Sequence, residues 1–276
     1  MAQITASDVN KLRKSTGAGM MDCKKALVEA DGDFDKATQI IREKGQAIAN
    51  KRSDREASEG VVLAKTNDNH TKGAIISLNC ETDFVAKNDD FVAIAEKILN
   101  KAVENFPADI DALKNIELDG KPIGDIVVEQ SGIIGEKIEL SFFDKLEAEY
   151  ISAYIHSDKK LATLVGFNKA GIDEQVGKDV AMQVAAMSPV AVDEKQVPQE
   201  VIEKELEIGR HQALAEGKPE NLVDKIAQGK LGKFYKENTL VNQAFIKDSK
   251  MSIKQYLQQA DKELTIKAFK RYSIKQ

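Results

Sequence analysis

The sequence predicts an α+β protein: a small N-terminal bundle of three helices, then a core of two antiparallel-sheet subdomains with an inserted antiparallel helical hairpin. Three observations favour this class. Apolar residues recur at helical spacing over roughly the first 45 residues. The middle of the chain instead alternates short extended runs with turn residues. Two further helical patterns, over 198–216 and 219–237, are joined by Gly217-Lys218 alone, which is typical of a helical hairpin.

The composition allows two domains and disfavours a nucleic-acid partner. With 276 residues, of which 42% are hydrophobic, the chain is long enough to bury more than one core. The 40 Lys and Arg residues are outnumbered by 45 Asp and Glu residues, which gives a formal charge of −5. Because binding to a phosphate backbone needs a basic face, this balance argues against RNA or DNA binding.

Three short helices are expected at the N-terminus. Thr5 with Asp8 resembles a capping box that opens the first helix, and Gly17-Ala18-Gly19 ends it. A second helix is expected over 20–30. Asp33 caps a third, which we expect Gly45 to close.

Two adjacent methionines open the second of these helices. Met20 and Met21 cannot both point inward, because neighbours on a helix diverge by about 100°. We expect one of them to fill the core. An exposed methionine beside Leu12 would form a small apolar docking patch.

A charged linker and a hairpin follow the bundle. Residues 49–60 are dense in charge without an apolar period, so they read as a helix end and a linker. Strand-like runs at 61–64 and 73–79 flank the turn-rich residues 67–70, which predicts a hairpin.

The stretch 80–88 lies between the second of these strands and a helix expected over 89–104. Thr82, Asp83 and Phe84 therefore lie where a strand passes into a helix, a place that can present an acidic side chain and an aromatic ring outward. The alternative is that Phe84 belongs to the core and Asp83 caps the helix.

The rest of the chain completes the core. Only short helices are predicted over 105–132, and a helix over 173–187 is stopped by Pro189. Residues 135–138 open the next strand, and strand-like runs follow at 150–156, 161–166 and 264–272. The expected domains are the bundle with its linker, the first core subdomain, the second core subdomain in two pieces, and the hairpin: 1–55, 56–140, 141–188 with 231–276, and 189–230.

No site for covalent chemistry, a metal or a cofactor is found. The chain has no phosphate-binding Gly-x-x-x-x-Gly-Lys-Ser/Thr loop. Ser152 and His156 share one strand face, but no nucleophile elbow or acidic partner accompanies them. Cys23 and Cys80 stand far apart and are read as reduced, buried thiols. We therefore expect neither an enzyme nor a metalloprotein.

The start of the chain has neither a basic region nor an apolar core of a leader peptide, and no apolar run reaches membrane-spanning length. A cytoplasmic protein without a membrane partner is therefore expected.

Two motifs resemble a known family. Residues 80–88 closely resemble the Thr-Asp-Phe-Val signature of bacterial elongation factor Ts, the guanine-nucleotide exchange factor of elongation factor Tu. Residues 12–27 are similar to the N-terminal signature of that family. Weaker matches are Gly135-Glu136-Lys137-Ile138, similar to Gly-Glu-Asn-Ile, and 181–186, similar to Ala-Met-His-Val-Ala-Ala with Gln183 where His is usual.

The resemblance implies a function and a partner. It implies a translation elongation factor whose bundle resembles a ubiquitin-associated domain. Such a factor binds elongation factor Tu with GDP and disturbs its magnesium and phosphate site, so that GDP leaves and GTP binds. It holds no nucleotide itself, and its hairpin can mediate self-association.

The resemblance also implies which residues meet the partner. Ile134 and Gly135 match positions near the Phe84 site, and His156 matches a strand-end histidine that contacts the partner. Met182 and Gln183 are candidate contacts, although Met182 suits the core equally well. The expected partner-binding and exchange residues are Thr82, Asp83, Phe84, Val85, Leu12, Met20, Met21, Ile134, Gly135, His156 and Met182.

One alternative remains open on composition alone. A protein-binding adaptor could use the N-terminal bundle to recruit a ligand and the core as a scaffold. Kinetics of GDP release distinguish the two functions, because an adaptor binds without accelerating release.

Overall fold

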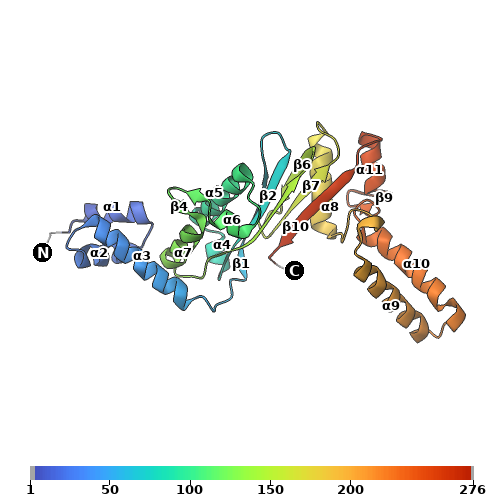
Figure 1. The fold of residues 1–276 in the computed structure, drawn as a ribbon, viewed down its shortest axis with the longest axis horizontal. Coiled ribbons are helices and arrows are strands. Elements are labelled where there is room, and N and C mark those ends of the chain that lie inside the picture. Colours follow the sequence, from blue (N-terminus) through green and yellow to red (C-terminus); the bar gives the residue numbers. More distant parts are fainter. Residues whose placement is uncertain (1–3, 275–276) are drawn as a thin grey trace. The chain divides into compact units, whose positions relative to one another are not determined.

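The computed structural model describes residues 4–274 and confirms a mixed helix and strand fold of the α+β class, with small antiparallel sheets (Figure 1). The chain divides into two compact units, each described by itself below. The first takes in the described residues of 1–63, 76–144 and 274–276, and the second takes in residues 64–75 and 145–273.

Three helices open the first unit: α1 (Ala6–Thr16), α2 (Met20–Glu29) and α3 (Phe34–Lys51). The predicted capping box is present, since the Thr5 hydroxyl accepts from the Asp8 amide and the Asp8 carboxylate accepts from the Thr5 amide. The three helices enclose a small cluster of buried apolar residues: Val9, Leu12, Ala18, Cys23, Ala26, Leu27, Ala30 and Ala37.

Helix α3 is longer than the sequence predicted. It continues through Gly45 to Lys51, and Gly45 is buried within it. The reason is tertiary: α3 packs against α7 (Ile123–Ile134), and the two backbones approach closely at Gly45 and Gly132. Packing at this point outweighs the poor helix propensity of glycine.

Strands β1 (Glu59–Thr66), β2 (Lys72–Cys80) and β5 (Glu139–Glu147) form a sheet in the order β1-β2-β5. The turn after β1 is closed by the Asn67 side chain, whose oxygen accepts from the amides of Thr71 and Lys72. Beyond β2 come the single turn α4 (Asp83–Ala86) and the amphipathic helix α5 (Asp89–Asn105).

The segment predicted only as short helices contains more structure. Helix α6 (Ile110–Lys114) precedes a pair of two-residue strands, β3 (Glu117–Leu118) and β4 (Lys121–Pro122). Helix α7 then extends to Gly135, which closes it with a φ of 79°. A glycine suits this left-handed position because it has no Cβ to clash.

The second unit contains an antiparallel sheet of β6 (Tyr150–Ile155), β7 (Leu161–Phe167) and β10 (Ile266–Ser273) in the order β10-β7-β6. Helix α8 (Glu174–Met187) packs on β6 and β7. Shorter elements complete the core around a shared apolar cluster: β8 (Ala244–Phe245), β9 (Asp248–Ser252) and α11 (Ile253–Ala260). The single turn η1 (Glu194–Gln196) has no buried residue.

Helices α9 (Gln199–Ala215) and α10 (Glu220–Asn238) lie side by side in the same unit (Figure 1). Gly209 lets them approach, since a Cβ there would lie 3.1 Å from the Ala227 Cα. Outside this narrow seam the pair is held by exposed contacts such as that from Arg210 Nε to Asp224 Oδ1, at 2.7 Å.

Over residues 4–274, no helix combines the length and apolar character needed to cross a membrane. The same residues contain no cluster of three or more His, Cys, Asp or Glu side chains placed to hold a metal ion. The expectation that the chain has no leader peptide rests partly on residues 1–3, which lie outside the described part.

Candidate functional site

Phe84 projects from the turn that follows β2. Thr82 is the N-cap of α4, and its hydroxyl accepts from the Val85 amide at 3.5 Å. The Phe84 side chain is 83% exposed, although its ring is one of the largest apolar groups in the chain. The alternative in which Phe84 belongs to the core and Asp83 caps the helix is therefore wrong. A lone exposed aromatic ring on a short turn suits insertion into another surface.

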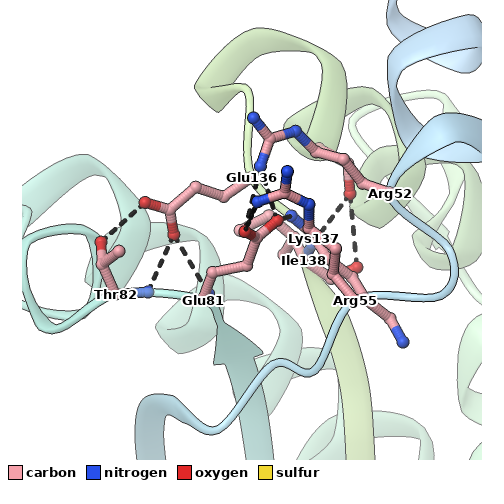
Figure 2. A network of polar contacts seen from close by, with 8 residues as sticks. Arg52, Arg55, Glu81, Thr82, Glu136, Lys137 and Ile138 are labelled. Carbon is pink, nitrogen blue, oxygen red and sulfur yellow. Dashed lines mark hydrogen bonds and ion pairs between the residues drawn. The ribbon is translucent and has the colours of Figure 1, made fainter.

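The base of this turn is held by a carboxylate from a distant part of the chain. Glu136 follows α7, and its Oε2 accepts from the amides of Glu81 and Thr82 at 3.1 and 3.0 Å (Figure 2). Its other oxygen accepts from the Thr82 hydroxyl at 2.6 Å. Three hydrogen bonds to one charged group fix the backbone directly before Asp83.

The Glu81 carboxylate makes the reciprocal contact, with the segment that contains Glu136. It accepts from the Lys137 amide at 2.6 Å and from Arg52 and Arg55 at 2.8 and 3.2 Å (Figure 2). Burial raises the pKa of the Glu81 carboxyl, but the Lys137 amide and the two arginines outweigh it, and the pKa lies below its ordinary value of 4.5. Glu81 therefore stays charged, and it ties the linker after α3 to the base of the Phe84 turn.

Two further side chains complete the turn. The buried Cys80 thiol donates to the Thr82 carbonyl at 3.1 Å. Burial, with the nearby Glu136 charge, raises its pKa to about 12, so it is not a nucleophile at neutral pH. The Asp83 carboxylate forms an exposed ion pair with Lys87 at 2.6 Å. The turn thus offers an acidic group and a ring for binding, and no reactive thiol.

Ile134 and Gly135 lie at the end of α7, directly before Glu136, and both are partly exposed. Their link to the Thr82 turn is the next residue, Glu136, which bonds to Thr82. Val85 is partly exposed on α4 itself. The structure brings this part of the predicted set together around Phe84, within the first unit.

The bundle presents its apolar surface differently from expectation. Both methionines are exposed, Met20 to 42% and Met21 to 63%, because Cys23, Ala26 and Leu27 form the buried side of α2. The expectation that one of the two fills the core is therefore wrong. Leu12 is fully buried in the bundle core and is not part of the surface. Val28, which is 58% exposed, lies seven residues after Met21 and so on the same helix face.

In the second unit His156 is exposed at the end of β6, with its Nδ1 3.1 Å from the Tyr154 hydroxyl. Met182 is partly buried on α8. Gln183 is fully buried, and its amide group bonds to Gln243, to the Ala244 carbonyl and to the Ile246 amide. The expectation that Gln183 meets a partner is wrong for this structure, because its amide is used inside the fold.

Sequence reasoning missed the residues that support the turn: Glu81, Glu136, Arg52 and Arg55. The signal for Glu136 was the Gly-Glu motif at 135–136, but its role depends on a contact across 54 or 55 residues of chain. Val28 could have been found from its helical spacing to Met21.

Comparisons with known proteins agree with the motifs. A family model described as "Elongation factor TS" matches residues 81–276. Curated proteins named "Elongation factor Ts" are similar over nearly the full chain. That of Christiangramia forsetii is 53% identical over 276 residues, covering 99% of this chain and 100% of the relative. That of Porphyromonas gingivalis is 52% identical over 272 residues, 98% of each chain, and that of Flavobacterium psychrophilum is 51% identical over 275 residues, 99% of this chain and 100% of the relative.

Proposed function

The chain belongs to the elongation factor Ts family of translation elongation factors, and we propose that it binds elongation factor Tu with GDP and promotes GDP release, so that GTP can bind. In this proposal it forms no covalent intermediate and holds no nucleotide itself. Its place of action is the cytoplasm, where translation occurs.

The observation that supports exchange most strongly is Phe84, exposed on a turn whose base is fixed by Glu136. A phenylalanine ring can bury roughly 150–250 Å² in a partner pocket. At about 25 cal/mol per Å² this provides several kcal/mol, enough to compete with side chains or a loop of the partner for the same space. Because the turn is already ordered, little of that free energy is lost on ordering it.

Asp83 supplies the polar part of the proposed mechanism. Asp83 directly precedes Phe84 in the single turn of α4, and its side chain is partly exposed. Placed near a bound magnesium ion and phosphates, a carboxylate can accept hydrogen bonds from groups that otherwise hold the nucleotide, or repel the phosphate charge. Asp83 and Phe84 together would destabilise the magnesium and phosphate side of bound GDP.

Exchange by this route follows from linkage. The factor must bind nucleotide-free elongation factor Tu more tightly than the GDP-bound form. The affinity of elongation factor Tu for GDP is then lowered by the same ratio when the factor is bound. Each tenfold preference corresponds to about 1.4 kcal/mol.

Other parts of the chain would hold the partner. The bundle, which we propose to be ubiquitin-associated-like, would bind with Met20 and Met21, and Leu12 would support them from below. His156 and Met182 would meet a second domain of the partner. We assign the domains as 1–55, 56–140, 141–188 with 231–276, and the inserted hairpin 189–230, which is the candidate for self-association.

The test is the dissociation rate of fluorescent GDP from elongation factor Tu, with the intact protein and with Phe84→Ala. We expect acceleration by the intact protein and a loss of at least tenfold in the variant. Val190→Ala, which shortens another exposed apolar side chain, is the matched control and should behave like the intact protein. A well-folded intact protein that binds without accelerating release would support the adaptor function instead.

A further inference from the structure

The N-terminal bundle is joined to α7 at a point where two helix backbones meet. A Cβ built on Gly132 of α7 would lie 2.1 Å from the Gly45 Cα and 2.8 Å from the Gly45 carbonyl carbon. No side chain can occupy that space unless the helices separate. The reverse substitution is different, because a Cβ on Gly45 would lie 3.5 Å from the Gly132 Cα, which is ordinary contact.

Two further contacts flank this crossing. Three residues earlier on both helices, Arg42 Nε lies 3.3 Å from Glu129 Oε1, and Lys121 also bonds to Glu129 at 2.7 Å. Three residues is close to one helical turn, so this ion pair lies directly beside the glycine contact. Such a half-exposed pair adds orientation more than stability.

The turn between α1 and α2 touches the same helix. A Cβ on Gly17 would lie 3.5 Å from the Ile133 Cδ1, so the Ile133 side chain packs on this turn. The turn before α2 and the helix after it therefore both lie against α7, and α2, which carries Met21 and Val28, packs on that second helix, α3.

Helix α7 also leads directly to the Phe84 turn. Four residues after Gly132, just beyond the end of α7, the Glu136 carboxylate bonds to the Thr82 amide and hydroxyl. At the other side, α3 continues into Arg52, which bonds to Glu81. Two routes thus connect the bundle to the base of the turn, one through Gly132 and one through Arg52.

We propose that the contact between Gly45 and Gly132 is a positioning joint, which holds the Met21 and Val28 surface at a fixed distance from Phe84. This inference rests on the proposed function, because the two surfaces are taken to bind one partner. Two linked surfaces held at the spacing of their sites give a high effective concentration for the second contact. With the joint opened, the bundle would be held only by the bonds of Arg52 and Arg55 to Glu81 and would move relative to Phe84. The effective concentration for the second contact would then fall.

The test compares Gly132→Ala with Gly45→Ala in the full chain. Both replace a helical glycine by a residue of higher helix propensity, so any general stabilisation is shared. We expect Gly132→Ala to raise the concentration of factor that gives half-maximal GDP release at least tenfold, with the maximal release rate within twofold of the intact protein. Gly45→Ala should leave both values unchanged.

A second variant guards against damage to α7. Gly45→Leu forces the helices apart from the α3 side and leaves the α7 sequence intact, so it should reproduce the rise. Amide hydrogen exchange should become faster at 42–48 and 129–133 in both opened variants and stay slow at Glu81 and Thr82. If Gly132→Ala and Gly45→Leu reach half-maximal GDP release at the same factor concentration as Gly45→Ala, the joint has no positioning role. If the intact protein does not accelerate release at all, the proposed function fails instead.

Discussion

The carboxylates of Glu81 and Glu136 bind backbone amides across the same junction: the Glu81 carboxylate accepts from the Lys137 amide at 2.6 Å, and the Glu136 carboxylate accepts from the Glu81 amide at 3.1 Å. The Glu81 carboxylate thus satisfies a backbone donor after α7, and the Glu136 carboxylate satisfies backbone donors after β2. The pair joins the end of β2 to the residues after α7, directly before the turn that carries Phe84.

Replacing Glu136 by Gln should loosen the Phe84 turn. The variant keeps one acceptor oxygen but turns an NH₂ group toward backbone donors, so at least one charge-assisted hydrogen bond is lost. We expect a decrease of about 1–3 kcal/mol in the free energy of unfolding, measured by urea denaturation. Glu139→Gln, at a half-exposed ion pair with Lys137, is the control and should cost less than about 0.5 kcal/mol. Equal losses in the two variants would contradict the bracing role.

Glu81 should contribute to acid sensitivity. Its pKa is lower in the folded protein than the ordinary 4.5, so its stabilising contribution is fully present above that value. The contribution is lost as the pH falls through the lower folded pKa. We therefore expect the free energy of unfolding to fall less steeply below about pH 4.5 in Glu81→Gln than in the parent protein. Denaturation curves at several acidic pH values measure this, and parallel slopes would refute it.

Phe84→Ala should reduce the acceleration of GDP release at least tenfold at almost no cost in stability. Because the ring is already in water, its removal should change the free energy of unfolding by less than about 0.5 kcal/mol. Phe91 on α5 offers a matched contrast, since it is 2% exposed and its truncation should cost about 3–5 kcal/mol. Thermal or urea unfolding of both variants gives the comparison. A large destabilisation by Phe84→Ala would mean that the ring packs against its own chain.

The face of α2 formed by Met21 and Val28 should contribute to affinity. Shortening both residues to Ala removes exposed apolar area without opening the bundle core. We expect the Kd for elongation factor Tu to rise about tenfold, which corresponds to about 1.4 kcal/mol. Isothermal titration calorimetry measures this, with Val190→Ala as the control. An unchanged Kd would remove Val28 and Met21 from the interface.

Asp179 should control the ionisation of Tyr256 in the second unit. Asp179 is buried on α8 and accepts from the Tyr256 hydroxyl at 2.9 Å and from Lys247 at 2.7 Å. Burial, together with this carboxylate, raises the pKa of Tyr256 to about 12. In Asp179→Asn we expect that pKa to fall toward 10, while burial keeps it above a free tyrosine.

Ultraviolet titration of the phenolate band measures this change. The chain has 5 tyrosines, so Tyr256→Phe provides the background spectrum to subtract. An unchanged pKa in Asp179→Asn would show that burial alone raises it.

Local hydrogen bonds made several elements predictable. Thr5 and Asp8 are three residues apart, and their reciprocal bonds form within the first turn of α1. Asp33 caps α3 through the amides of Asp35 and Lys36. Such contacts depend on a few neighbouring residues, so the pattern of side chains is enough to predict them. The same holds for the change from strand to helix around Thr82.

Glycine shows where local reasoning stops. The sequence pattern predicts that Gly45 ends a helix, because glycine weakens helices and often closes them. In the structure it lies inside α3, where the absence of a side chain admits the α7 backbone at Gly132. Locally, Gly45 destabilises the helix, whereas in the folded protein it allows α3 to pack against α7. Only the packing decides which effect prevails.

By itself, the sequence determined the α+β class, the capped helices of the bundle and the position of the Thr-Asp-Phe-Val motif between a strand and a helix. The tertiary structure decided that Phe84 is exposed, that Leu12 and Gln183 are buried, and that Glu136 supports a turn 54 or 55 residues away. The physical reason is range. Helix caps and turns are made by residues a few positions apart, whereas burial and paired carboxylates depend on segments that only the complete fold brings together.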